Sequence, residues 1–214
     1  MSSRREALRV LSAAAAASLV PKLWLPEWLE AAQTAPGGLP GCIVSPQQTQ
    51  GPYFVDKQLR RGDLRLDPAT GALTAGIPLT LSLNVVQIAG NDCRPLAGAV
   101  VDVWQCDAHG QYSGVVDRAQ GFDTRGKSFL RGYQVTDRDG RVEFTTIYPG
   151  WYPGRSVHIH FKVRTNESAG RAGEFTSQWY FDDGMSDAVF TSGPYAEKAG
   201  RLLERPLAHP RHVE

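Results

Sequence analysis

The chain lacks an excess of charge of either sign. Its 214 residues include 23 Lys and Arg against 22 Asp and Glu, which gives a formal net charge of +1, and the basic residues are scattered along the chain. A protein that binds nucleic acid typically presents a basic patch or stripe. We therefore expect no nucleic-acid partner.

Long apolar runs are also missing. No stretch reaches the ~20 predominantly apolar residues of an ordinary membrane-spanning helix, so we expect membrane contact only through an N-terminal export signal. There, the pair Arg4 and Arg5 precedes a weakly apolar, Ala-rich stretch, Leu11–Val20. This order is typical of a twin-arginine (Tat) signal. The alternative is a short amphipathic helix of the folded domain.

The signal predicts a protein exported to the periplasm or the cell exterior. Residues 1–41 would form the signal and a linker, and residues 42–214 one domain, which is long enough to bury a core without staples. No clean A-x-A cleavage site lies between Leu25 and Pro36. Cleavage and an uncleaved anchor therefore both stay open.

Cysteine is scarce, with only Cys42, Cys93 and Cys106. In an exported protein, one disulfide and one leftover thiol is the simplest pattern. Cys93 and Cys106 flank a predicted strand of about ten residues, which at ~3.3 Å per residue separates them too far for a bridge. Cys42 is therefore predicted to be in the disulfide, with its partner open; the alternative is three reduced, buried thiols.

Frequent glycine (22) and proline (14) indicate many turns between short strands. Apolar residues alternate with polar ones in several short segments, and residues 137–140 read as a turn. We expect residues 91–98 to be a second turn and at most one short helix after Met185. This pattern predicts an all-β fold, an antiparallel β-sandwich, with strands at 77–90, 99–107, 130–136, 141–150, 156–165 and 175–183.

One predicted strand contains two histidines, in the stretch GWYPGRSVHIHFKV. Residues two apart in a strand face the same side, so His158 and His160 project together while Ile159 and Phe161 face the core. An H-x-H pair can offer two imidazoles to one metal ion. Alone the signal is weak, because strand histidines are more often ordinary polar residues on a solvated face.

Nearby residues strengthen the prediction of a metal site. Tyr152 and Arg155 lie in the loop that leads into the strand, and Tyr112 is expected to end another strand. Imidazole nitrogens with phenolate oxygens suit a hard, oxidised iron, which can lower the pKa of a phenol from ~10. No Asp or Glu stands beside the H-x-H pair. His109 is an alternative ligand, although turn residues of this kind are usually solvated.

With these residues the chain resembles the intradiol ring-cleavage dioxygenases, the family of catechol 1,2-, hydroxyquinol and protocatechuate 3,4-dioxygenases. The resemblance runs from Ser45 to Asp183 and is closest to an exported, single-chain branch. The matching stretches are TQGPYFVD, PLAGAVVDVWQCDAHGQYSG, FLRGYQVTDRDGRVEFTTIYPGWYPGRSVHIHFKV and SQWYFDD.

The resemblance implies a non-haem Fe(III) cofactor held by four ligands: Tyr112, Tyr152, His158 and His160. It also implies that Tyr152 accepts a substrate proton, that Arg155 lies close to the bound substrate, and that Gln178 supports the site from nearby. Tyr53 would line the substrate pocket. The reaction would be cleavage of a catechol-type aromatic by O2 to a cis,cis-muconate.

The sequence leaves the substrate, the oligomeric state and an alternative class of protein open. The loop 115–128 is expected to shape the pocket, but its charged residues do not identify the catechol. The helical N-terminal domain through which cytosolic relatives dimerise is not expected here, and the oligomeric state is unknown. The alternative class is a non-catalytic, exported β-sandwich module, because a shared fold does not carry function.

Overall fold

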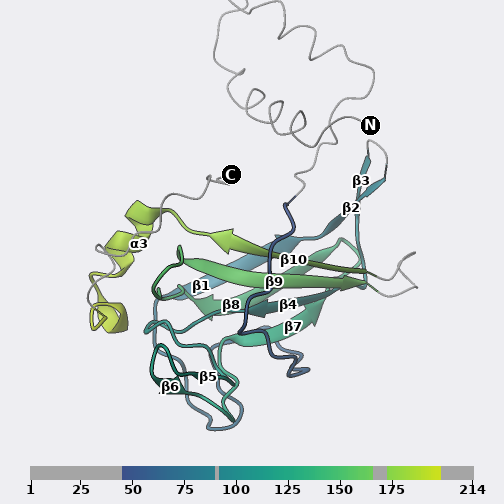
Figure 1. Cartoon of the computed structure of the whole chain (residues 1–214). Helices are drawn as coiled ribbons and strands as arrows, with labels where there is room; N and C mark the ends of the chain where they lie inside the picture. Colours follow the sequence, from purple (N-terminus) through teal and green to yellow (C-terminus); the bar gives the residue numbers. More distant parts are fainter. Residues whose placement is uncertain (1–44, 90–91, 166–172, 199–214) are drawn as a thin grey trace, which may run out of the picture. The chain divides into compact units, whose positions relative to one another are not determined.

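A computed structural model describes residues 45–89, 92–165 and 173–198 (Figure 1). The predicted Tat signal, the linker up to residue 41 and Cys42 lie outside these ranges. In the described part of the chain, no helix is both long and apolar enough to cross a membrane.

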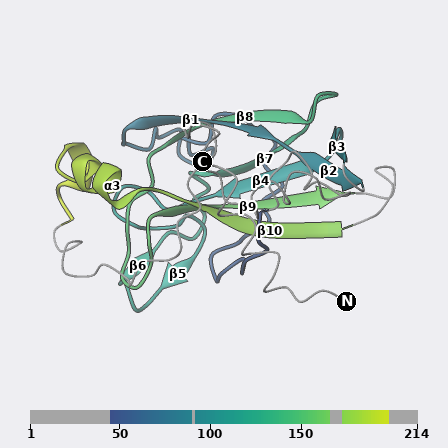
Figure 2. The same ribbon diagram turned by 90° about the horizontal axis from the view of Figure 1, so that it is seen from above.

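Two antiparallel sheets form the body of the domain. One sheet pairs β1 (Pro78–Asn84) with β8 (Arg141–Ile147). The other has the order β10 (Gly173–Tyr180), β9 (His158–Thr165), β4 (Val100–Trp104) and β7 (Arg131–Val135). Figure 2 shows β1 and β8 as a separate layer over the four-stranded sheet. This architecture confirms the predicted antiparallel β-sandwich.

The core lies between these two layers. Its side chains alternate along each strand, as period-2 patterning requires: Leu79, Leu81 and Leu83 come from β1, and Val142 and Phe144 from β8. The four-stranded sheet contributes four buried side chains, Val101, Val103, Ile159 and Phe161, and partly buried ones that include Trp179. Because these residues fill the inner face, the alternate residues of β4 and β9 must face away from the core.

The long strand predicted over residues 77–90 is wrong in its extent. At Val85 the backbone N–H donates to Gly140 O (2.8 Å), in the turn before β8, and Val85 O accepts from Leu96 N (2.9 Å). The chain therefore leaves β1 there and continues as β2 (Val86–Ala89), which pairs with β3 (Asp92–Pro95). The predicted turn at residues 91–98 thus contains a strand.

The remaining elements are short. β5 (Val116–Asp117) pairs with β6 (Phe122–Asp123) inside the loop 115–128. The helix α3 (Asp183–Val189) begins two residues before Met185, and the 3-10 turn η3 (Gly193–Tyr195) follows it. The strand predicted to extend to residue 183 ends at Tyr180, and the Asp182 carboxylate accepts from Met185 N (3.0 Å) and caps α3.

The cysteines follow the predicted pattern in part. Cys93 is disulfide-bonded and Cys106 is a buried free thiol. The two are therefore not bridged to each other, as their spacing predicts. The alternative of three reduced thiols is wrong, and the prediction for Cys42 concerns a residue outside the described ranges.

Candidate functional site

The outer face of β9 carries both histidines of the H-x-H pair. His158 and His160 are only 2% and 1% exposed, although they face away from the sandwich core. The register explains the surroundings of His160, because it pairs with Trp104 of β4 on one side and Gln178 of β10 on the other. The histidines are thus buried under loops rather than solvated, which removes the alternative of ordinary surface residues.

Two loops bring tyrosines to these histidines. Tyr112 lies in the loop that follows β4, and Tyr152 in the loop between β8 and β9. The Nε2 atom of His158 lies 3.3 Å from Tyr112 Oη, 3.1 Å from Tyr152 Oη and 3.1 Å from His160 Nε2. All four predicted metal ligands, called the donor cluster below, therefore converge around one point.

Both imidazoles are favoured in their neutral form. His158 Nδ1 lies 2.6 Å from Ser156 O, to which it donates, so the Nε2 lone pair faces the cluster. Burial and then the positive charge of Arg155 lower the pKa of His158 to about 4. Burial, the neighbouring His158 and the positive charges of Arg155 and Arg131 lower the pKa of His160 to about 2.

The phenols are shifted in the opposite direction. Burial raises the pKa of Tyr112 well above its ordinary value, and burial likewise raises the pKa of Tyr152, with Arg155 partly opposing the shift. Without a cation both phenols keep their protons. A bound cation would release those protons, because it offsets the cost of burying the phenolate charge.

The geometry of the donor cluster fits a metal ion. Ligands about 2.0–2.1 Å from one ion and roughly 100° apart are themselves about 3.1 Å apart, close to the observed separations. No group of three or more His, Cys, Asp or Glu side chains in the described ranges could hold a metal. A metal ion here would therefore need the tyrosines. His109, the alternative ligand, is exposed and lies outside the cluster, with its Nε2 atom 3.9 Å from Glu197 Oε2.

The two tyrosine-bearing loops are pressed together through glycines. Gly110 has φ +81°, and a Cβ atom there would overlap Trp151 O; a Cβ atom at Gly150 would overlap Asp107 O. Gly150 N also donates to Asp107 O (3.1 Å). Backbone therefore packs against backbone within five residues of each tyrosine, which only glycine permits.

Arg155 and Gln178 form one unit beside the cluster. An Arg155 Nη2 proton is donated to Gln178 Oε1. The Gln178 amide in turn donates to Thr49 O (3.0 Å), and Tyr180 Oη donates to Gln178 Oε1 (3.2 Å). Gln178 thus holds the guanidinium and joins it to the N-terminal arm, residues 45–59.

Tyr53 lies against both tyrosines of the donor cluster. Its ring stacks on Tyr112, with centroids 4.5 Å apart and planes 17° apart, and meets Tyr152 edge-on at 6.0 Å. Tyr53 Oη donates to Asp117 Oδ2 (2.5 Å), which also accepts from Gln120 Nε2 (2.9 Å). Residues of β5 and the turn after it therefore fix this ring, a role that the sequence did not single out.

Trp104 and Arg131 are further neighbours that sequence reasoning did not assign to the site. Trp104 is buried on the outer face of the sheet, where it stacks on His160. Arg131, opposite Trp104 in β7, is buried and donates to Ser113 Oγ (2.8 Å) and Tyr53 O (3.2 Å). A charged residue within a predicted strand was the available signal for Arg131.

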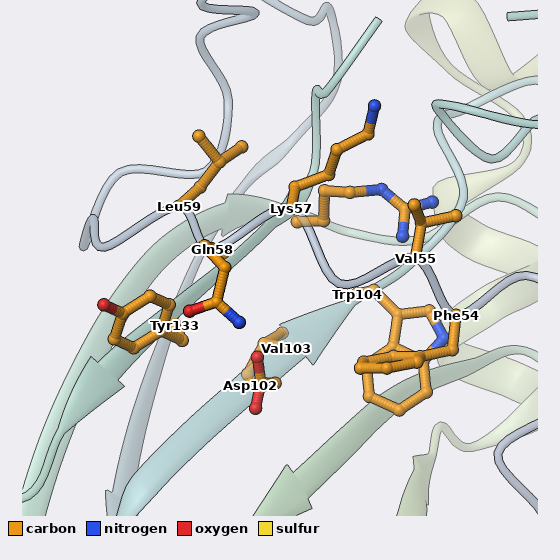
Figure 3. Close-up of a pocket in the computed structure, with 11 residues that line it drawn as sticks. Phe54, Val55, Lys57, Gln58, Leu59, Asp102, Val103, Trp104 and Tyr133 are labelled. Atoms are coloured by element: carbon orange, nitrogen blue, oxygen red, sulfur yellow. The ribbon is translucent and has the colours of Figure 1, made fainter. Parts of the chain in front are cut away.

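A small cleft adjoins the donor cluster without containing it (Figure 3). It lies between the N-terminal arm and strands β4 and β7. Among the residues that line it are Phe54, Val55, Gln58, Asp102, Trp104 and Tyr133. Trp104 is therefore shared, with one side lining this cleft and one ring face lying on His160.

Known proteins that are similar to this chain are dioxygenases. A family model described as "Dioxygenase" matches residues 49–203. The chain is 31% identical over 112 residues to a chlorocatechol 1,2-dioxygenase of Pseudomonas sp. (strain P51), covering 44% of this chain and 41% of that protein. It is 31% identical over 156 residues to the protocatechuate 3,4-dioxygenase beta chain of Burkholderia cepacia, covering 67% and 64%.

A solved structure shares the fold. The intradiol ring-cleavage dioxygenase of Tetranychus urticae superposes with a TM-score of 0.62 at 33% identity, covering 78% of this chain and 76% of that one. The chain spans less than two thirds of the two curated relatives named above, 41% and 64% of their lengths. Because the family model covers more than half of the chain, this protein belongs to the intradiol ring-cleavage dioxygenase family.

Proposed function

We propose that this protein is a non-haem Fe(III)-dependent enzyme that opens the ring of a catechol between its two hydroxyl-bearing carbons. One O2 molecule is consumed, both of its atoms enter the product, and the product is a cis,cis-muconate. The observation that carries this proposal is the convergence of Tyr112 Oη, Tyr152 Oη and His160 Nε2, each 3.1–3.3 Å from His158 Nε2.

The donor cluster would hold the iron. Two phenolates and two neutral imidazoles place two negative charges around the ion, which favours Fe(III) over softer or divalent metals. Bound Fe(III) would act as a Lewis acid and template for a chelating catechol and make its ring reactive toward O2.

Tyr152 is the residue suited to accept a proton. A catechol must lose two protons to bind as a chelate, so a base is needed at the site. Of the four cluster residues Tyr152 is the most exposed, at 8%, against 0% for Tyr112. Its Oη atom can therefore take a substrate proton while the three more deeply buried residues of the donor cluster stay in place.

Arg155 supplies a permanent positive charge. Its influence reaches both imidazoles and both phenols of the donor cluster. A guanidinium does not titrate at neutral pH, so it can stabilise negative charge that develops on the substrate. Gln178 keeps it oriented. Tyr53 contacts the substrate through its ring, because its hydroxyl proton is already donated to Asp117.

The first experiment is a visible absorption spectrum of the purified protein, followed by catechol under argon. The proposal predicts a broad tyrosinate-to-Fe(III) band that moves to longer wavelength when catechol binds. The matched variant is His160→Ala, which should lose both iron and colour. A protein that stays colourless after ferric reconstitution contradicts the proposal and favours the non-catalytic β-sandwich module.

Export is a separate proposal, supported by the Arg4–Arg5 pair and the Ala-rich stretch after it. Replacing both arginines with lysine should abolish Tat-dependent export while the charge of the segment stays the same. Fractionation of cells that express each version tests this. Equal export of both versions would contradict a Tat signal.

A further inference from the structure

The described C-terminal segment reaches the two loops that carry the tyrosines of the donor cluster. Lys198 Nζ donates to His109 O (2.7 Å) and to Trp151 O (2.9 Å). It also lies 4.8 Å from the centroid of the Trp151 ring. A single ammonium group thus bridges two loops that are 42 residues apart in the chain (151 against 109).

The two carbonyls stand directly next to the site. His109 precedes Tyr112 by three residues, and Trp151 immediately precedes Tyr152. The loops already meet at Gly110, where a Cβ atom would overlap Trp151 O and lie 2.7 Å from Lys198 Nζ. The ammonium therefore occupies the junction at which the spacing of the two loops is set.

Lys198 is itself held by a buried anchor. Tyr195 is fully buried, its Oη donates to Tyr148 O (2.7 Å), and it accepts from Ile77 N (3.1 Å). The backbone N–H of Lys198 donates to Tyr195 O (3.2 Å). The turn from Tyr195 to Lys198 thus holds the lysine at a defined place. Tyr195 binds one end of the segment 148–151, and Lys198 binds the other end.

We propose that Lys198 is a positioning residue that sets the separation of Tyr112 and Tyr152, and hence the geometry of the donor cluster. Its ammonium satisfies two backbone carbonyls at once, and charged hydrogen bonds of this kind are stronger than neutral ones. The consequence for iron rests on the proposed function; the effect on the two loops does not.

The test compares Lys198→Met with Arg138→Met. Methionine keeps an unbranched side chain and loses the positive charge, and Arg138 is an exposed basic residue in the turn 137–140, away from both tyrosine loops. In the iron-loaded protein, Lys198→Met should shift the tyrosinate-to-Fe(III) band and weaken iron binding roughly 10- to 100-fold, as changes around metal ligands typically do. Lys198→Arg should restore part of the band position and part of the iron affinity. Arg138→Met should change neither the band nor the iron affinity.

Amide hydrogen exchange on the metal-free protein provides the second readout. Lys198→Met should raise exchange at residues 107–112 and 150–152 together, and Arg138→Met should not. An unchanged band, unchanged iron affinity and unchanged exchange in Lys198→Met would overturn the inference, even if the variant unfolded at a lower temperature. Failure of the wild type to bind iron, with both loops loosened in Lys198→Met, would overturn the proposed function alone.

Discussion

The indole ring of Trp104 lies flat on the imidazole ring of His160, with centroids 4.9 Å apart and planes only 4° apart. The two residues are direct partners across β4 and β9. On the opposite face of the same sheet, Trp179 stacks on Phe161 with centroids 4.0 Å apart. β9 therefore carries one aromatic stack toward the donor cluster and one toward the sandwich core.

These two stacks predict different outcomes for the same substitution. Trp104→Leu should lower the unfolding free energy by roughly 2–4 kcal/mol. It should also weaken iron binding about 2- to 10-fold, because a stacked pair contributes about 0.5–1.5 kcal/mol to holding the ring. Trp179→Leu should destabilise the fold without changing iron affinity. Denaturant titration and chelator competition measure the two effects; equal iron affinity in both variants would contradict the role of Trp104.

Arg155 is predicted to act in the reaction rather than in iron binding. Arg155→Lys keeps the charge but loses the planar fork that reaches Gln178. We expect kcat to fall roughly 10²- to 10³-fold, as for the loss of one preorganised donor, with the visible band of the resting protein unchanged. Arg125→Lys, at an exposed arginine paired with Asp123, is the control. Steady-state oxygen uptake measures kcat, and the visible spectrum reports whether iron is still bound. Loss of iron in Arg155→Lys would instead assign Arg155 a structural role.

Gly110 is predicted to be indispensable for the junction of the two loops. Gly110→Ala meets both a positive φ and Trp151 O, so the unfolding free energy should fall by about 2–5 kcal/mol. Gly98 also has a positive φ, +75°, but a Cβ atom there has open space around it. Gly98→Ala should therefore cost only about 1–2 kcal/mol. Similar losses in the two variants would show that the close packing at Gly110 is unimportant.

Cys106 is predicted to be chemically inert in the native protein. It is 1% exposed, its Sγ lies 3.5 Å from Gly150 O, and burial raises the pKa of its thiol. A thiol-reactive disulfide reagent at pH 8 should therefore modify it only after unfolding. Modification that occurs in the wild type but not in Cys106→Ser is assigned to the Cys106 thiol. Rapid native modification that disappears in Cys106→Ser would contradict the burial.

Local patterns were enough to predict the strands of the two main sheets and the side to which the two histidines point. Alternation of apolar residues predicts β1, β4, β8 and β9, because a strand repeats every two residues. The same rule places His158 and His160 together and Ile159 in the core. It failed at Val85, where the strand changes partner: that change depends on the turn at Gly140, 55 residues away.

Contacts between distant segments lie beyond such patterns. The sequence alone determined the sandwich class, the pairing of two imidazoles on one strand face and, through family resemblance, the identity of the two tyrosines. Only the tertiary structure showed that Trp104 faces His160 rather than the core, that Asp117 fixes Tyr53, and that Lys198 bridges the two tyrosine loops. The physical reason is that periodicity reports which side of a strand a residue faces. Register and loop packing determine what lies on that side.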